Sequence, residues 1–267
     1  MGNKVIFGIY VPTNSIIHRL DPRLKFMACF WYVILVFFAN SVSTNIWLGL
    51  VLLIFMRLSK VSTKMYWSGI KPLMWVIIVT ALVQLFFSAG GHTYWQWHFL
   101  SITSAGIVQS IYLILRFAYI ITISTVLTVT TTTLQLADAI EHLMKPLKYI
   151  KVPVNQIAMM LSIALRFIPT IMSEVQTIMN AQRARGMDFS QGNLFQRAKK
   201  LVPVMIPLFV SSFKRAEELA IAMEARGYDP NRERTKYRVL TWQSRDTYAL
   251  LLVVLISIIL FALKIVF

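Results

Sequence analysis

The sequence has 267 residues, of which 57% are hydrophobic and 14% are charged. Soluble domains carry about 25% charged residues, so this composition argues against a soluble globular protein and indicates one embedded in a membrane. The formal net charge is +16. Anionic lipid and acidic protein partners account for such a charge, and no nucleic acid partner is expected. The single cysteine, Cys29, excludes a disulfide within the chain, and no metal site is expected.

Five apolar segments are predicted to be membrane-spanning helices: residues 24–39, 42–58, 72–88, 105–130 and 247–263. The last three are each about as long as a helix that crosses a bilayer. The first two are shorter, and the sequence ANSVSTN between them predicts a tight helical hairpin. Asp21 followed by Pro22 predicts where the first helix starts, because Asp is a good N-cap and Pro suits the first helical position. Arg116 is the one charge inside 105–130, and it either faces a partner or cavity or snorkels towards an interface.

The basic residues predict how these helices are oriented. Of the 27 Lys and Arg residues, 25 lie at or before the start of the first segment, between the end of the second segment (Arg57 onward) and the third, or in residues 131–245. The positive-inside rule places these regions in the cytoplasm, with the N-terminus inside and the C-terminus outside. We therefore predict three regions: residues 1–130 with four spans, a cytoplasmic module at 131–245, and the last span at 246–267.

The cytoplasmic region contains three stretches with helical periodicity. Apolar residues at intervals of three and four predict helices at 134–145, at Val154–Arg185, and from Pro203 or Pro207 to Arg226. Pro169 lies inside the second helix, so we expect a kink there. Both long helices are expected to lie at or under the membrane surface, each with an apolar face that a monomer cannot fully bury. The expected fold is all-α: about five transmembrane helices and a cytoplasmic module of long amphipathic helices.

A phrase of the form A-x-x-A-R-G-x-D occurs twice, 41 residues apart, as AQRARGMD at 181–188 and AMEARGYD at 222–229. Glycine after a basic last turn is a common helix stop, which is the simplest interpretation. Two copies with the same flanking residues favour recognition of a partner instead. The alanines leave the helix tip slim, the arginine offers a planar fork of donors for carboxylates, and the glycine turns the chain away. The candidate residues are Ala184, Arg185, Gly186, Ala225, Arg226 and Gly227, supported by Ala181, Asp188, Ala222 and Asp229.

The paired Ala-Arg-Gly motifs, HRLDPRLK before the first span, and ALRFIPTIMSEVQTIMNAQRARGMD closely resemble the T component of energy-coupling factor (ECF) vitamin transporters. The resemblance implies a bacterial cell-membrane scaffold of an ABC importer. Such a scaffold joins two homologous cytosolic ATPases, which use ATP and Mg²⁺, to a membrane-embedded S component that captures the vitamin or micronutrient. It further implies that the two tips dock into the ATPases. No cofactor is expected on this chain itself.

Two other classes of protein are alternatives. A permease subunit of a conventional ABC importer usually contacts one ATPase, so a single tip would be expected. An integral-membrane enzyme would need clustered Asp, Glu or His, whereas the nine acidic residues of 131–245 are dispersed along helix surfaces. The chain also contains no G-x-x-x-x-G-K-[ST] phosphate loop. We therefore expect no catalytic site in this chain, and the sequence does not name the vitamin.

Overall fold

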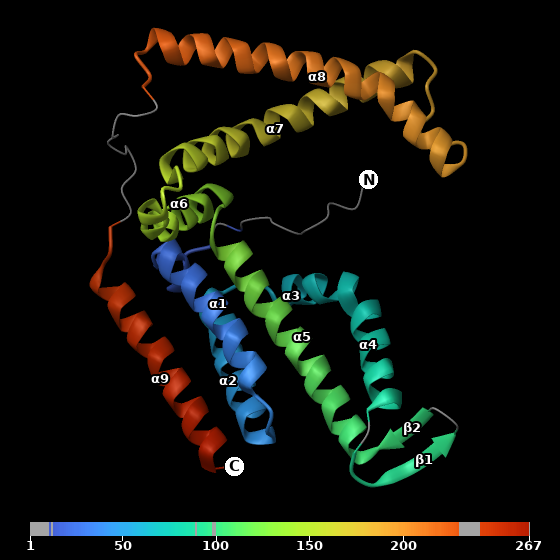
Figure 1. The fold of residues 1–267 in the computed structure, drawn as a ribbon, viewed down its shortest axis with the longest axis vertical. Helices are drawn as coiled ribbons and strands as arrows, with labels where there is room; N and C mark the ends of the chain where they lie inside the picture. The colour runs from blue at the N-terminus through green and yellow to red at the C-terminus, as the bar shows by residue number, and fades with distance from the viewer. Residues whose placement is uncertain (1–10, 12, 89, 98–99, 230–240, 267) are drawn as a thin grey trace. The chain divides into compact units, whose positions relative to one another are not determined.

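The computed structural model describes residues 11, 13–88, 90–97, 100–229 and 241–266, and its fold is drawn in Figure 1. The chain forms two compact units. The first, called the bundle below, comprises Met1–Leu143 and Leu240–Phe267. The second, called the crossed-helix unit, comprises Met144–Val239.

Helices dominate the bundle. They are α1 (Pro22–Phe38), α2 (Val42–Ser59), α3 (Thr63–Ile70), α4 (Met74–Phe87), α5 (Ser104–Thr130), α6 (Thr133–Met144) and α9 (Ser244–Val266), with 3-10 turns at Ile17–Arg19 and Lys71–Leu73. In Figure 1, α1, α2, α5 and α9 run alongside one another, and α4 packs on α5. Their core is apolar, with Leu35, Leu48 and Leu260 fully buried. The buried Tyr32 hydroxyl donates to the Leu48 carbonyl at 2.9 Å, so this hydroxyl is not left unsatisfied in the core.

The α1–α2 hairpin forms as the sequence predicts. The side chain of Asp21 accepts a hydrogen bond from the backbone N–H of Arg23 at 2.8 Å, and a proline occupies the first turn of α1. Ser41 starts α2 in a capping box with Thr44. The buried Asn45 amide donates to two carbonyls of the connecting turn, at 3.2 and 2.9 Å. These bonds satisfy the backbone groups that a tight turn leaves open.

Arg116, in the middle of α5, reaches the tip of this hairpin. Its guanidinium donates to the side-chain oxygen of Asn40 at 3.4 Å and lies over the Phe37 ring at 5.3 Å. Asn40 is exposed in the turn between α1 and α2, at the end of the bundle away from the basic segments. The geometry therefore favours the snorkelling interpretation of Arg116 over a role inside the bundle.

A short sheet departs from an entirely helical chain, although the all-α class is confirmed. Strand β1 (Thr93–Trp97) pairs antiparallel with β2 (Leu100–Thr103). Aromatic residues such as Tyr94 and Trp95 favour strands, but no strand was predicted here from the sequence. Thr103 then starts α5: its hydroxyl accepts from the Gly106 N–H at 3.0 Å and donates to the Ser88 carbonyl at 2.9 Å.

Five helices are long and apolar enough to cross a membrane, counted over the described residues: Val42–Ser59, Thr63–Phe87, Ser104–Thr130, Val154–Ala184 and Ser244–Val266. Four of them match predicted spans, and one of these four starts earlier, at Thr63. The remaining predicted span is α1, which has only 17 residues but contributes the buried Tyr32, Leu35 and Val36 to the core. Val154–Ala184 was not among the predicted spans; it meets the requirements of both length and apolar composition, with a mean hydropathy of 1.4, the lowest of the five, against 3.1 for α9.

The crossed-helix unit contains the two longest helices described. After a 3-10 turn at Lys145–Ile150, α7 runs from Val154 to Ala184 and α8 from Leu194 to Ala225. The predicted extent of α7 is confirmed to within one residue, and Pro169 lies inside it. The predicted start of α8 at Pro203 or Pro207 was wrong, because Asn193 and Gln196 form a capping box well before both prolines. The helix continues through the prolines and is bent (Figure 1), as prolines inside a helix dictate.

Candidate docking tips

Each of the two Ala-Arg-Gly motifs ends a helix, and the two helix ends have the same hydrogen bonds. In the first, residues 181–188, the Gly186 N–H donates to the Arg183 carbonyl at 2.9 Å and the Met187 N–H to the Gln182 carbonyl at 3.0 Å. In the second, residues 222–229, the Gly227 N–H donates to Glu224 at 2.9 Å and the Tyr228 N–H to Met223 at 3.0 Å. Both are Schellman motifs, in which the chain folds back on the last turn and satisfies its free carbonyls. These two segments are called tip 1 and tip 2 below.

Glycine at each tip is required by backbone conformation, not by crowding. Gly186 has φ +86° and Gly227 has φ +69°, in the left-handed region that side chains resist. A Cβ at either position would meet no atom within 4 Å. The simple helix stop of the sequence analysis is therefore present at both tips. A helix stop does not explain why the same alanines and arginine precede the glycine at both tips.

The candidate recognition residues are all at the surface. Ala181, Ala184 and Arg185 of tip 1 are exposed, as are Ala222, Ala225 and Arg226 of tip 2. Each arginine is the C-cap residue of its helix, with φ near −90° and ψ near 10°. Small side chains at positions three residues apart share one helix face, so each tip presents a slim face with a guanidinium at its end. Such a tip can enter a groove that carries carboxylates.

The loop after tip 1 is braced from within the unit. The Asp188 carboxylate accepts hydrogen bonds from the Ser190 N–H at 2.8 Å and the Ser190 hydroxyl at 2.6 Å. These bonds hold the pKa of Asp188 below its usual value. The Lys200 ammonium donates to the carbonyls of Asp188 and Gln191 at 2.7 and 2.9 Å. At tip 2 the matching Asp229 is exposed, and the chain beyond it, residues 230–240, lies outside the described residues.

An ion pair that was not predicted from the sequence joins α7 to α8. Arg215 Nη2 lies 3.0 Å from Glu174 Oε2, and the same guanidinium lies over the Phe167 ring at 5.6 Å. The side chains of Arg215 and Glu174 are 29% and 24% exposed. In Figure 1, α7 and α8 run in opposite directions within the unit, so their C-terminal tips point to opposite ends of it. One compact unit therefore carries two separated tips.

Much of the apolar surface of α7 and α8 is uncovered in the chain alone. Exposed side chains on α7 include Met160 and Met172, and those on α8 include Phe209 and Phe213. Phe213 is 74% exposed. Large exposed apolar side chains in such number mark a contact with lipid or with another protein. Among the described residues, no three His, Cys, Asp or Glu side chains gather into a group that could hold a metal ion.

Comparison with known proteins identifies the family. The sequence profile of the cobalt transport protein family CbiQ matches residues 13–237. The energy-coupling factor transporter transmembrane protein EcfT of Limosilactobacillus fermentum is 58% identical over 99% of both chains. The proteins of the same name from Streptococcus equi and Bacillus subtilis are 52% and 45% identical, and each alignment covers at least 97% of both chains.

The chain belongs to the family of energy-coupling factor transporter transmembrane proteins. The resemblance read from the motifs is confirmed over nearly the whole length. The chain is thus the T component of an ECF transporter and a multi-pass membrane protein. The full-length matches are to EcfT proteins, so they favour this family over a conventional permease subunit or a membrane enzyme.

Proposed function

We propose that this T component is the non-catalytic scaffold of an ATP-driven importer in a bacterial cell membrane. Two homologous cytosolic ATPases bind ATP and Mg²⁺ and dock on tip 1 and tip 2. A membrane-embedded S component, which captures a vitamin or similar micronutrient, rests on the exposed apolar faces of α7 and α8. The N-terminus and the crossed-helix unit lie in the cytoplasm and the C-terminus lies outside, as the distribution of basic residues indicates.

The observation that carries this proposal is the duplicated helix ending. Two helices of one chain end in the same Schellman motif with the same exposed Ala-x-x-Ala-Arg-Gly sequence. Two similar tips are suited to two related binding grooves, and a pair of homologous ATPases would provide one groove each. Each arginine can form bidentate hydrogen bonds with a carboxylate or with the free carbonyls at the end of a partner helix.

The tips also suggest how ATP hydrolysis reaches the membrane. Stiff helices of 31 and 32 residues lead from the tips to the shared crossing. When ATP binding draws the ATPases together and hydrolysis lets them part, the two tips change their separation. The apolar surfaces behind the tips shift with them, and the S component that rests there changes its orientation in the bilayer.

A double charge reversal tests the docking assignment. Arg185→Glu with Arg226→Glu places carboxylate against carboxylate, and we expect loss of ATPase co-purification together with loss of uptake. Arg185→Lys with Arg226→Lys retains the charges but not the planar fork, so assembly should be weakened but not abolished. Unchanged co-purification and uptake in the Glu variant would remove the tips from the ATPase interface.

A matched control separates docking from bulk charge. Lys199 is exposed on the first part of α8 and outside both tips. Lys199→Glu changes the net charge by the same amount per site and should leave assembly intact. The stoichiometry of the pull-down is a second readout, since a T component should bring two ATPase chains per copy.

A further inference from the structure

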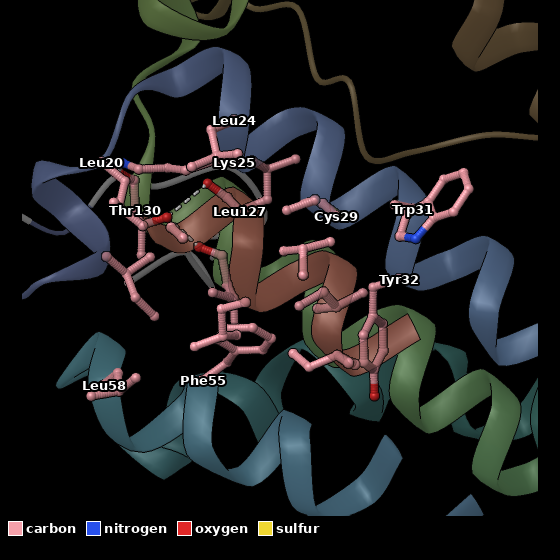
Figure 2. Close-up of a pocket in the computed structure, with 18 of the residues that line it drawn as sticks. Leu20, Leu24, Lys25, Cys29, Trp31, Tyr32, Phe55, Leu58, Leu127 and Thr130 are labelled. Atoms are coloured by element: carbon pink, nitrogen blue, oxygen red, sulfur yellow. Dashed lines mark hydrogen bonds between the residues drawn. The ribbon is translucent and has the colours of Figure 1, made fainter. Parts of the chain in front are cut away.

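The bundle contains a partly open apolar cavity of about 360 Å³ between α1, α2, α5 and α9 (Figure 2). Leu24, Cys29 and Tyr32 line it from α1, Phe55 and Leu58 from α2, and Leu127 from α5. Side chains of α9 from Tyr248 to Ile256 close the remaining side. All of these residues belong to the bundle, and none is part of either tip. A cavity with so few polar groups gives water nothing to bind, so it favours an apolar occupant.

One end of this cavity is basic. Lys25 and Arg245 both line it there, beside Thr130 at the end of α5. The Lys25 ammonium is held by the protein, since it donates to the His18 carbonyl at 3.1 Å and the Thr130 carbonyl at 3.0 Å (the Lys25–Thr130 region is drawn in Figure 2). Arg245, in the first turn of α9, is exposed. Of the two cations that line the cavity, Arg245 is therefore the one that an incoming group can reach.

Two carboxylates lie at the same end, and both are turned inward. The buried Asp246 accepts the backbone N–H of Asp21 at 2.8 Å and that of Gln243 at 2.9 Å. The buried Asp21 accepts the N–H of Arg23 at 2.8 Å. Arg245 donates to the side-chain oxygen of Gln243, a neutral group. The acids thus fix the start of α1 and α9, and the outward side of the rim remains positive.

Aromatic residues flank the exposed arginine. Trp242 is 47% exposed and Tyr248 is 72% exposed, one on each side of Arg245 in the sequence. Indole and phenol rings gather where the hydrocarbon of a bilayer meets its headgroups. The apolar cavity, the cation at its end and the aromatic pair therefore match, in order, the tail, phosphate and interfacial zone of a phospholipid.

We propose that this cavity binds one acyl chain of an anionic phospholipid whose phosphate is held by Arg245. The basic end faces the cytoplasm by the positive-inside rule, and the cytoplasmic leaflet offers anionic headgroups. Basic pockets between transmembrane helices on that side are known to take such headgroups. The occupant ties α9 to α1, α2 and α5 on the side where the cavity leaves them apart. This site is independent of ATPase docking at the tips.

The headgroup contact is tested on the full-length chain purified in detergent. Native mass spectrometry follows retention of added dioleoylphosphatidylglycerol and of dioleoylphosphatidylcholine, which has the same acyl chains and no net charge. We expect the wild-type protein to retain the anionic lipid several-fold better. Arg245→Gln should reduce its retention to the level of the zwitterionic lipid, and Arg245→Lys should preserve most of the preference.

Arg57→Gln is the matched control for charge. Arg57 is an exposed arginine in the last turn of α2, at the same basic end, and it does not line the cavity. Its substitution should leave the preference unchanged. Equal retention of both lipids by the wild-type protein, or the same loss in Arg57→Gln as in Arg245→Gln, would overturn the proposal.

A second variant tests the acyl chain separately. Ala28 lines the cavity from α1 and is only partly buried, so Ala28→Phe should fill part of the space and lower retention of both lipids. Helix content by circular dichroism shows whether the variant folds. A folded Ala28→Phe protein that retains the anionic lipid like the wild-type protein would contradict insertion of the acyl chain. If this variant does not fold, the Arg245 and Arg57 series decides the proposal alone.

Discussion

Glu174 and Arg215 form the ion pair that joins α7 to α8, and they are separated by the same 41 residues that separate the two tips. Each lies ten residues before the last alanine of its own tip, Ala184 or Ala225. At about 1.5 Å per residue, the contact is therefore roughly 15 Å from both helix ends. The ion pair thus joins positions that lie equally far from the two tips, and this contact is called the pivot below.

The pivot predicts a charge-swap experiment. Glu174→Arg or Arg215→Glu alone places like charges together, so each should lower uptake and loosen the crossing. Combining both substitutions restores the pair with its ends exchanged, and most of the loss should be recovered. The free energy at stake is small, about 1 kcal/mol, because the pair is partly exposed. Uptake into vesicles of the assembled transporter is the measurement.

The control for this swap is the neighbouring Lys214. It is exposed and takes part in no ion pair with Glu174. Lys214→Glu should leave uptake near the wild-type level. If the combined Glu174→Arg, Arg215→Glu protein is as impaired as the single variants, the ion pair does not set the pivot.

The tip glycines predict a graded series. Side chains at Gly186 and Gly227 meet open space, so only the positive φ opposes substitution, at about 1–2 kcal/mol per site. Asparagine tolerates this conformation better than alanine, and valine tolerates it least. ATPase co-purification should therefore fall in the order Gly, Asn, Ala, Val at either tip. Equal recruitment by Gly186→Val and the wild-type protein would mean that the left-handed turn is not needed for docking.

The sequence was sufficient where short-range physics decides the structure. The N-cap at Asp21, the turn around Ser41 and both glycine stops follow from local hydrogen bonding and backbone preference, and each was found by pattern. The predicted start of α8 was wrong because the helix was taken to begin at a proline, and the Asn193–Gln196 capping box was not recognised. An interior proline only bends a helix whose other hydrogen bonds hold.

Pairings between distant segments were not predicted. The spacing of Glu174 and Arg215 matched that of the tips and could have suggested their contact, since equivalent residues of a crossed repeat can meet at the crossing. The cavity behind Arg245 gave no such signal, because it depends on how four helices pack. The docking roles of the tip residues stay predictions.

Arg116 predicts a nearly neutral substitution. Its guanidinium meets Asn40 at 3.4 Å and the exposed Phe37 ring, both at the hairpin tip, and not a buried partner. Arg116→Gln should therefore change uptake by less than about 2-fold and stability by less than about 1 kcal/mol. Assembly and uptake measured together are the test. Loss of uptake in a complex that still assembles would assign Arg116 a role in transport.

His18 predicts a mild acid sensitivity of the bundle. It lies in the 3-10 turn before α1, where its Nδ1 is 2.7 Å from the Ser15 hydroxyl and its Nε2 is 3.1 Å from the Val11 carbonyl. Burial lowers the pKa of His18 below its ordinary 6.5, and the nearby Lys25 charge acts in the same direction, against the bond to Val11. The folded chain therefore holds this imidazole neutral at a pH where the unfolded chain takes up a proton.

Stability should accordingly be unaffected by His18 above pH 6.5 and should decline as the pH falls below that value, because the unfolded state then binds more protons. The measurement is the thermal unfolding midpoint in nanodiscs from about pH 7 to about pH 5. His18→Gln keeps a polar group in place without this titration, so its midpoint should fall less over the same interval. Carboxylates that titrate in both proteins cancel in the comparison. Parallel curves for the two proteins would show that the His18 proton does not couple to folding, and that acid acts on the bundle through other groups.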